Sequence, residues 1–182
     1  MIARAYHRGA RVRGLIDLPF GAAQAGEHTC PRVVAARSEI LVAHRGDTEE
    51  ARAVGAVELD MPRRAFALEV TDSFVYHVGL YNHPDDAELG DDERAVVAQM
   101  LATRLGFEDG GAGAGVQCSP VRHGRTGIGQ DHLHVGTGLI WEDGRTQFLS
   151  RRRDFAVLSE VRREADALYG LTGATRRAVD AA

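Results

Sequence analysis

Three histidines lie close together in the second half of the chain, two of them separated by a single residue. The stretch VRHGRTGIGQDHLHVGTGLIWEDG contains His123, His132 and His134. Side chains at positions i and i+2 of a strand point to the same face, so His132 and His134 are expected to project together. Neutral imidazole is a common metal ligand, and three imidazoles leave coordination positions for water or a substrate oxygen. The spacing therefore predicts an open three-histidine metal site.

The residues around these histidines show how the site would be built. Leu133 and Val135 alternate with the paired histidines and are expected to face the core. His123 ends the preceding strand, and the connection GRTGIGQD returns the chain so that His123 lies beside the other two. Asp131 precedes His132 and is expected to orient a ligand histidine through a hydrogen bond. The alternative interpretation is a chance cluster of histidines on a solvent-facing strand, without metal.

The ion itself does not follow from the histidines. Imidazole suits manganese, zinc and nickel, whereas magnesium prefers oxygen ligands. We expect a divalent cation, with manganese or magnesium first and zinc or nickel as alternatives. Any of these would polarise an oxygen of a bound substrate.

The elements expected to position the site alternate along the chain. Patterns rich in β-branched and aromatic residues predict strands at 72–82, 116–123 and 132–141. Amphipathic helices are expected in 91–107, stopped by Gly106, and in 152–171, stopped near Gly170. The segment 45–70 is ambiguous: it predicts a short helix that Pro62 breaks. The glycine-rich stretch 110–115 follows a helix and precedes a strand, the reverse of a phosphate-binding loop, and is interpreted as a connection.

Length and composition favour one ordinary globular domain. The 182 residues are 44% hydrophobic and 26% charged, as in typical globular proteins. We expect a single domain over 1–182 with a frayed tail at about 172–182. The chain has no apolar run long enough for a bilayer and no signal-peptide pattern at its start. Cys30 and Cys118 lie far apart, which favours a cytoplasmic setting and core packing.

Charge is distributed unevenly along the chain. The net charge is −4, which argues against non-specific coating of nucleic acid, and all 22 cationic side chains are arginines. Arginine suits planar contacts with phosphate, and clusters near both ends predict a basic face. The alternative is a solvated surface with local acidic partners. The residues expected to contact DNA are Arg8, Arg11, Arg13, Arg151, Arg152 and Arg153.

These segments together resemble the relaxase/mobilisation nuclease family, the HUH-type endonucleases that nick plasmid DNA to start conjugative transfer. The likeness rests on the histidine block VRHGRTGIGQDHLHVGTGLIWEDGR and on the Glu-His-x-x-Pro pattern of EHTCP. It extends to MIARAYHRGARVRGLI, to the strand, acidic proline turn and helix of 75–107, and to the arginine-rich helix of 151–171. It covers most of the chain in the family's order and is similar to actinobacterial members.

The resemblance implies a fold, a cofactor and a substrate. The fold would be α+β, a central antiparallel sheet flanked by helices, related to the palm of rolling-circle replication initiators. A divalent metal held by His123, His132 and His134 would polarise the scissile phosphate of single-stranded DNA. The partners would be DNA at the origin of a mobile element and other mobilisation proteins.

The chain departs from the family at the nucleophile. The family attacks with an N-terminal tyrosine that becomes linked to the 5′ phosphate, but the corresponding segment GLIDLPFGAA has no tyrosine. The substitutes are Tyr6 and His28. His28 is favoured because it keeps the family's local Glu-His pattern. Either is expected to approach the metal more closely than the other tyrosines, Tyr76, Tyr81 and Tyr169.

Three functions remain open at this point. The first is a relaxase-type, metal-dependent endonuclease that nicks single-stranded DNA. The second is a degenerate relative that binds a mobile-element origin without cutting it. The third is an unrelated metal-dependent phosphoesterase, which is disfavoured because HLHVGTGL lacks the further alternating histidine of histidine-triad hydrolases.

Overall fold

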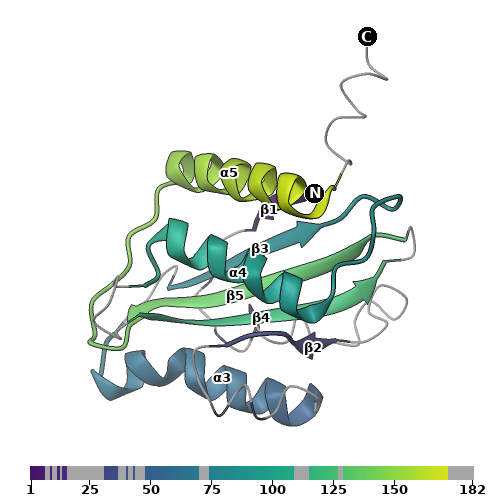
Figure 1. Cartoon of the computed structure of the whole chain (residues 1–182). Coiled ribbons are helices and arrows are strands. Elements are labelled where there is room, and N and C mark those ends of the chain that lie inside the picture. Colours follow the sequence, from purple (N-terminus) through teal and green to yellow (C-terminus); the bar gives the residue numbers. More distant parts are fainter. Residues whose placement is uncertain are drawn as a thin grey trace.

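The structure is a computed structural model, and its fold is an antiparallel sheet with helices on both faces (Figure 1). The residues that it describes are 1–6, 9, 12, 14–15, 31–36, 40, 43, 48–69, 74–108, 115–126 and 129–171. The expected tail at 172–182 lies outside these residues. The α+β class and the antiparallel sheet predicted from the sequence are confirmed.

Five strands form the sheet, in the order β1-β3-β5-β4-β2, and every neighbouring pair is antiparallel. The strands are β1 (Ile2–Ala5), β2 (Arg32–Val33), β3 (Val75–Tyr81), β4 (Val116–Arg125) and β5 (Asp131–Trp141). The central strand β5 is buried along its whole length because both of its faces are covered. The histidine-bearing strands β4 and β5 are therefore neighbours at the middle of the sheet.

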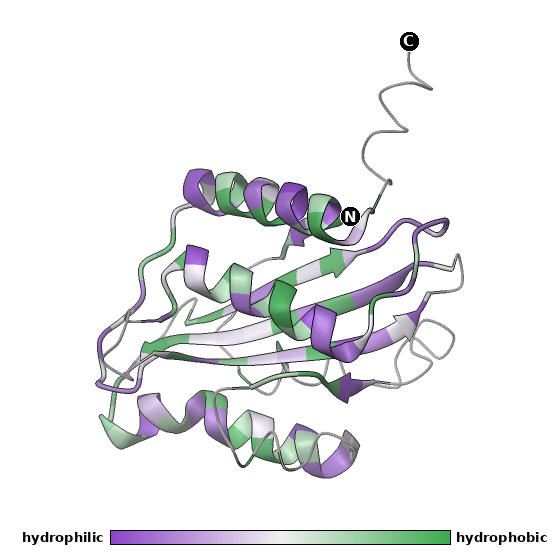
Figure 2. Ribbon diagram, viewed as in Figure 1, coloured by the Kyte–Doolittle hydropathy of each residue, from purple (hydrophilic) through white to green (hydrophobic). Residues whose placement is uncertain are grey.

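The described helices are α3 (Thr48–Ala65), α4 (Asp91–Leu105) and α5 (Arg151–Tyr169). Helices α4 and α5 lie on one face of the sheet and α3 on the other (Figure 1). Hydrophilic and hydrophobic residues alternate along α5, as expected for a helix with one buried side (Figure 2). None of the helices in the described ranges is long and apolar enough to cross a membrane.

Strand alternation sends the residues of β5 to two different cores. Leu133 and Val135 pack with residues of α4 and α5, as the sequence predicted. On the other face, Ile140 packs with Leu59 of α3. A Cβ at Gly138 would lie 2.9 Å from the carbonyl oxygen of Leu59, so glycine allows α3 to approach the sheet closely at this point.

Both predicted helix stops are confirmed by backbone geometry. Gly106 and Gly170 adopt φ values of 74° and 64° after α4 and α5, a left-handed conformation that glycine adopts at little cost. At the other end of α5, the hydroxyl of Ser150 accepts a hydrogen bond from the backbone N–H of Arg153 at 3.3 Å. That contact is the usual N-cap, and it explains why α5 begins at residue 151.

The prediction for 45–70 was wrong about Pro62. Helix α3 runs through Pro62 to Ala65, although proline removes one backbone donor. One tertiary contact and two ion pairs within the helix accompany this continuation. Leu59 is buried against the sheet, and the carboxylate of Asp60 binds Arg63 at 2.6 Å and Arg64 in the following turn.

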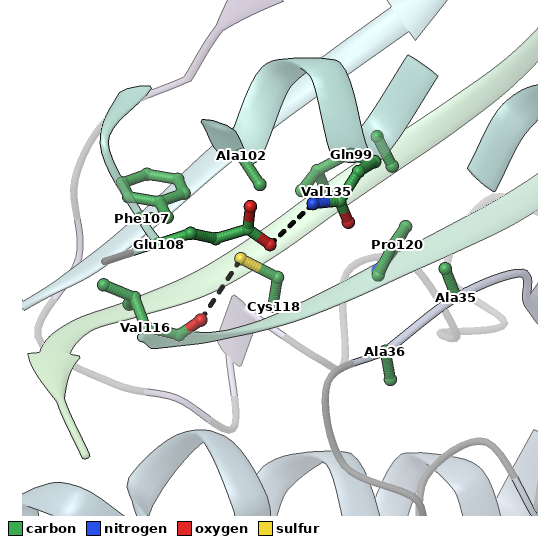
Figure 3. A pocket seen from close by; sticks show the side chains of 11 residues that line it. Ala35, Ala36, Gln99, Ala102, Phe107, Glu108, Val116, Cys118, Pro120 and Val135 are labelled. Carbon is green, nitrogen blue, oxygen red and sulfur yellow. Dashed lines mark hydrogen bonds between the residues drawn. The ribbon is translucent and has the colours of Figure 1, made fainter. Parts of the chain in front are cut away.

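A cavity lies between α4 and β4 (Figure 3). Its walls include Ala98 and Ala102 of α4 and Cys118 and Pro120 of β4. The thiol of Cys118 donates a hydrogen bond to the carbonyl oxygen of Val116 at 3.6 Å. The burial of Cys118 agrees with a packing role.

Candidate metal centre

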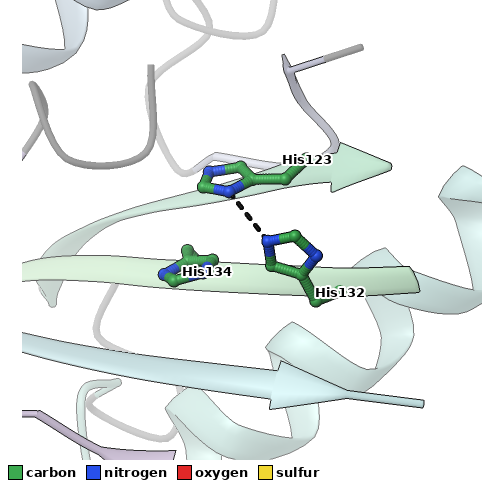
Figure 4. A group of neighbouring side chains, drawn as sticks. All are labelled: His123, His132 and His134. Atoms are coloured by element: carbon green, nitrogen blue, oxygen red, sulfur yellow. Dashed lines mark hydrogen bonds between the residues drawn. The ribbon is translucent and has the colours of Figure 1, made fainter. Parts of the chain in front are cut away.

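Strands β4 and β5 bring the three predicted histidines together (Figure 4). His134 lies opposite Val121, and the register then shifts between Arg122 and Gly124, so that Gly124 lies opposite His132. A shift of this kind bends a strand and re-aims its side chain. The result places Nδ1 of His123 3.0 Å from Nε2 of His132.

This three-histidine cluster could hold a metal ion. His123, His132 and His134 each offer a ring nitrogen, and these atoms lie within 4.8 Å of one another. Imidazole nitrogens at such separations can converge on one cation. The grouping predicted from the sequence is confirmed. The alternative of a solvent-facing strand is wrong, because the three side chains are 0%, 2% and 6% exposed in chain order.

Three further aromatic residues surround the histidines, and the sequence interpretation had placed only Tyr6 among them near the site. They are Tyr6, which follows β1, and His77 and Tyr81 on β3. The ring centroids of Tyr6 and His77 lie 4.4 Å apart, those of His123 and His134 4.3 Å, and those of Tyr81 and His132 5.1 Å. We call these six residues the aromatic cluster. The alternation His-x-Gly-x-Tyr at 77–81 is the signal that could have revealed its β3 part, because i and i+2 residues share a face.

His77 contacts a predicted ligand directly. Its Nε2 lies 2.5 Å from Nδ1 of His134, so Nδ1 of His134 is occupied and its Nε2 is the nitrogen available to a metal. Burial lowers the pKa of His77 to about 4, and its imidazole is therefore neutral near pH 7. A neutral ring can share one proton with His134 and so set the tautomer of that ligand.

Removing His77 should weaken metal binding although His77 is not one of the three ligands. We expect His77→Ala to lower the affinity for manganese by about 10- to 100-fold, the usual effect of losing a hydrogen bond that orients a ligand. His77→Gln, whose amide can still bond to His134, should recover part of the loss. Calorimetric titration measures both effects. An unchanged affinity in His77→Ala would show that the contact does not orient the ligand.

The two tyrosines meet above a glycine. The hydroxyls of Tyr6 and Tyr81 are in hydrogen-bond contact, and Oη of Tyr81 lies 3.4 Å from Nε2 of His134. A Cβ at Gly79 would come within 2.7 Å of the Tyr81 ring and 3.0 Å of the Tyr6 ring, so the bare backbone provides the room for both rings. Tyr6 was expected near the site and is there. Tyr81 was expected to lie farther from the metal site than Tyr6, and this prediction was wrong, because Oη of Tyr81 contacts a ligand histidine.

Asp131 does not orient a ligand histidine. Strand alternation directs it to the opposite face from His132, where it accepts hydrogen bonds from Arg94 and Arg122. Arg94 is only 2% exposed, and Asp131 supplies the negative charge that such a buried guanidinium needs. The sequence prediction failed because adjacent strand residues are neighbours along the chain but belong to different faces.

The arginines predicted to bind DNA do not all lie near the histidines. Arg152 and Arg153 are exposed on α5, which covers the face opposite the aromatic cluster. The predicted residues that lie outside the described part of the structure are His28, Arg8, Arg11, Arg13 and the side chain of Arg151. Arg4 does lie on the histidine side: it is exposed, stands opposite Gly79, and its guanidinium carbon is 5.6 Å from the centroid of the Tyr81 ring.

Comparison of the chain with protein-family models, with curated proteins and with solved structures finds no match. The site is a buried cluster of histidines that could hold a metal ion, flanked by two tyrosines on the α3 face of an antiparallel sheet.

Proposed function

We propose that the protein is a metal-dependent enzyme that nicks single-stranded DNA by transesterification, as relaxases do, with Tyr6 as the nucleophile. The observation that carries this proposal is the contact of Tyr6 with the histidines: its ring stacks on His77 and lies 5.9 Å, centroid to centroid, from His134. Phosphoryl transfer requires that the attacking group lies close to the bound phosphate, and a nucleophile on the same face of the sheet as the metal site meets this requirement.

The three histidines fit a divalent ion. Such an ion, when bound, would neutralise charge on a phosphoryl oxygen. All three donors are imidazoles, so manganese fits them better than magnesium, with zinc and nickel as alternatives. His77 would hold His134 in the orientation that presents Nε2.

The reaction needs no further reactant. The phenol oxygen of Tyr6 would form a bond to phosphorus while the bond from phosphorus to the 3′ oxygen breaks. The proton that leaves the phenol is balanced by the proton that the released 3′ hydroxyl gains. The product is a phosphotyrosine link to the 5′ end of the downstream strand.

Arg4 would hold the DNA beside the site. It is exposed on β1 next to Tyr81, where a guanidinium can bind the phosphate before or after the scissile one. Binding should therefore weaken steeply with salt. By the family resemblance, the substrate would be a mobile-element origin in the cytoplasm, with other mobilisation proteins as partners.

Substitution of Tyr6 tests the proposal. With manganese and a 3′-labelled pool of randomised single-stranded oligonucleotides, the unmodified protein should form a covalent adduct that survives denaturing electrophoresis. Tyr6→Phe should form none, because it keeps the ring but lacks the attacking oxygen. Mass spectrometry of the digested adduct identifies the modified residue.

Tyr169→Phe is the matched control. Tyr169 belongs to α5, and its hydroxyl contacts the carbonyl oxygen of Glu93 at 3.4 Å, on the side of the sheet away from the histidines. Its substitution should leave the adduct intact. Loss of the adduct only in His28→Ala would transfer the role to His28. Retained DNA binding without any adduct would contradict cleavage and support the degenerate binding protein.

A further inference from the structure

We propose that Tyr81 is the fourth protein ligand of the metal centre, its phenolate oxygen joining Nδ1 of His123, Nε2 of His132 and Nε2 of His134. The inference rests on the metal site proposed above but not on DNA cleavage. It names a donor of a different chemical kind from the three imidazoles.

The separations between donor atoms suit a single cation. Metal–nitrogen and metal–oxygen bonds of about 2.0–2.1 Å place two ligands of a tetrahedral site roughly 3.3–3.4 Å apart. Oη of Tyr81 lies 3.4 Å from Nε2 of His134, and Nδ1 of His123 lies 3.0 Å from Nε2 of His132. The distance between Tyr81 and His134 matches the ligand–ligand distance of a tetrahedral site. The distance between His123 and His132 would have to increase only slightly to match it.

The surrounding contacts hold these donors in place. His77 occupies Nδ1 of His134 at 2.5 Å, which leaves Nε2, the nitrogen beside Tyr81, for coordination. The ring of Tyr81 stacks on His132 at an interplanar angle of 8° and meets His134 edge-on at 78°. Two ligand histidines therefore fix where the hydroxyl of Tyr81 points.

Two neighbours would stabilise the phenolate. On coordination the ion replaces the phenol proton of Tyr81, and the proton passes to solvent. The hydroxyl of Tyr6 contacts Oη of Tyr81 and can donate a hydrogen bond to the oxygen once it is charged. The guanidinium of Arg4 lies over the same ring, 5.6 Å from its centroid, and contributes positive charge.

The fourth ligand has a chemical consequence. A set of three imidazoles and one phenolate favours a Lewis-acidic transition ion over magnesium, which prefers an all-oxygen, largely hydrated shell. An ion that accepts five or six ligands would still have room for a phosphoryl oxygen. Tyr81 and Tyr6 would then have separate tasks, one binding the ion and the other attacking the phosphate.

Copper(II) titration provides the test, because phenolate-to-copper charge transfer produces an intense visible absorption band, whereas copper bound by imidazoles alone shows only weak visible absorption. We expect the band in the unmodified protein at one equivalent of copper. Tyr81→Phe should lose it and bind copper at least about tenfold more weakly, while its ring keeps the stack on His132. Tyr169→Phe is the matched control, because it removes a phenol on the other side of the sheet, and it should retain both the band and the affinity. Tyr6→Phe removes a hydrogen bond to the phenolate and should keep the band with weaker binding.

Three results would overturn the assignment of Tyr81. Stoichiometric binding without a band in the unmodified protein would leave the three-histidine site and exclude a phenolate ligand. A band lost in Tyr6→Phe but kept in Tyr81→Phe would make Tyr6 the ligand. No binding of copper at all would contradict both the metal site and the fourth ligand. The absence of a DNA adduct in a protein that shows the band would contradict only the proposed cleavage and would leave the metal site standing.

Discussion

His132→Ala is expected to lower the affinity for manganese or nickel by at least about 100-fold. His132 lies beside the other two histidines, with Nε2 3.0 Å from Nδ1 of His123, and its loss leaves the ion with two imidazoles in place of three. Isothermal titration calorimetry measures the change. A thermal unfolding scan gives an independent check, because an ion at 100 times its dissociation constant adds about 2.7 kcal/mol to the stability of the folded state. That gain should disappear in His132→Ala.

His83 provides the matched control. It is the histidine of the turn after β3, and its Nδ1 lies 3.6 Å from Asp85, away from the aromatic cluster. His83→Ala should bind metal as the unmodified protein does. Circular dichroism should show that His132→Ala is folded, since His132 is buried. Folded His132→Ala with undiminished affinity would place the metal elsewhere or exclude it.

Asp131→Asn should destabilise the protein by roughly 3 kcal/mol, the effect expected when one partner of a buried ion pair is removed. The carboxylate of Asp131 binds both Arg94 and Arg122, and burial lowers the pKa of Arg94. In Asp131→Asn both guanidiniums would face a neutral amide in place of a carboxylate. Urea denaturation measures the loss of stability as a shift of the midpoint.

The same variant distinguishes between two roles of Asp131: the predicted orientation of a ligand histidine and the observed ion pairs with Arg94 and Arg122. Because its carboxylate points to α4, we expect the folded Asp131→Asn protein to keep the metal affinity of the unmodified chain within about threefold, less than loss of an orienting contact would cause. Glu164→Gln, which removes an exposed partner of Arg104, is the control for charge alone and should change stability only slightly. A large loss of metal affinity with little loss of stability would restore the orienting role.

Local patterns in the sequence determined the secondary structure around the site. The alternation of His132, Leu133, His134 and Val135 predicts a strand with imidazoles on one face and apolar residues on the other, and β5 is such a strand. The ends of α4 and α5 at Gly106 and Gly170 were also predictable from the local sequence. A left-handed residue often ends a helix, and glycine adopts that conformation irrespective of what the helix packs against. The grouping of the three histidines required only one additional assumption, that two consecutive strands pair.

The tertiary structure alone decided what surrounds those histidines. His77 and Tyr81 reach them because β3 pairs with β5, and Tyr6 because β1 pairs with β3. A strand order of this kind depends on contacts between residues far apart in the chain, on which local periodicity carries no information. Which residues cover a face is equally non-local. The burial of the histidines and the survival of α3 through Pro62 both depend on packing against other elements. The sequence thus determined the three histidines of the candidate metal centre, and the order of the strands determined their neighbours.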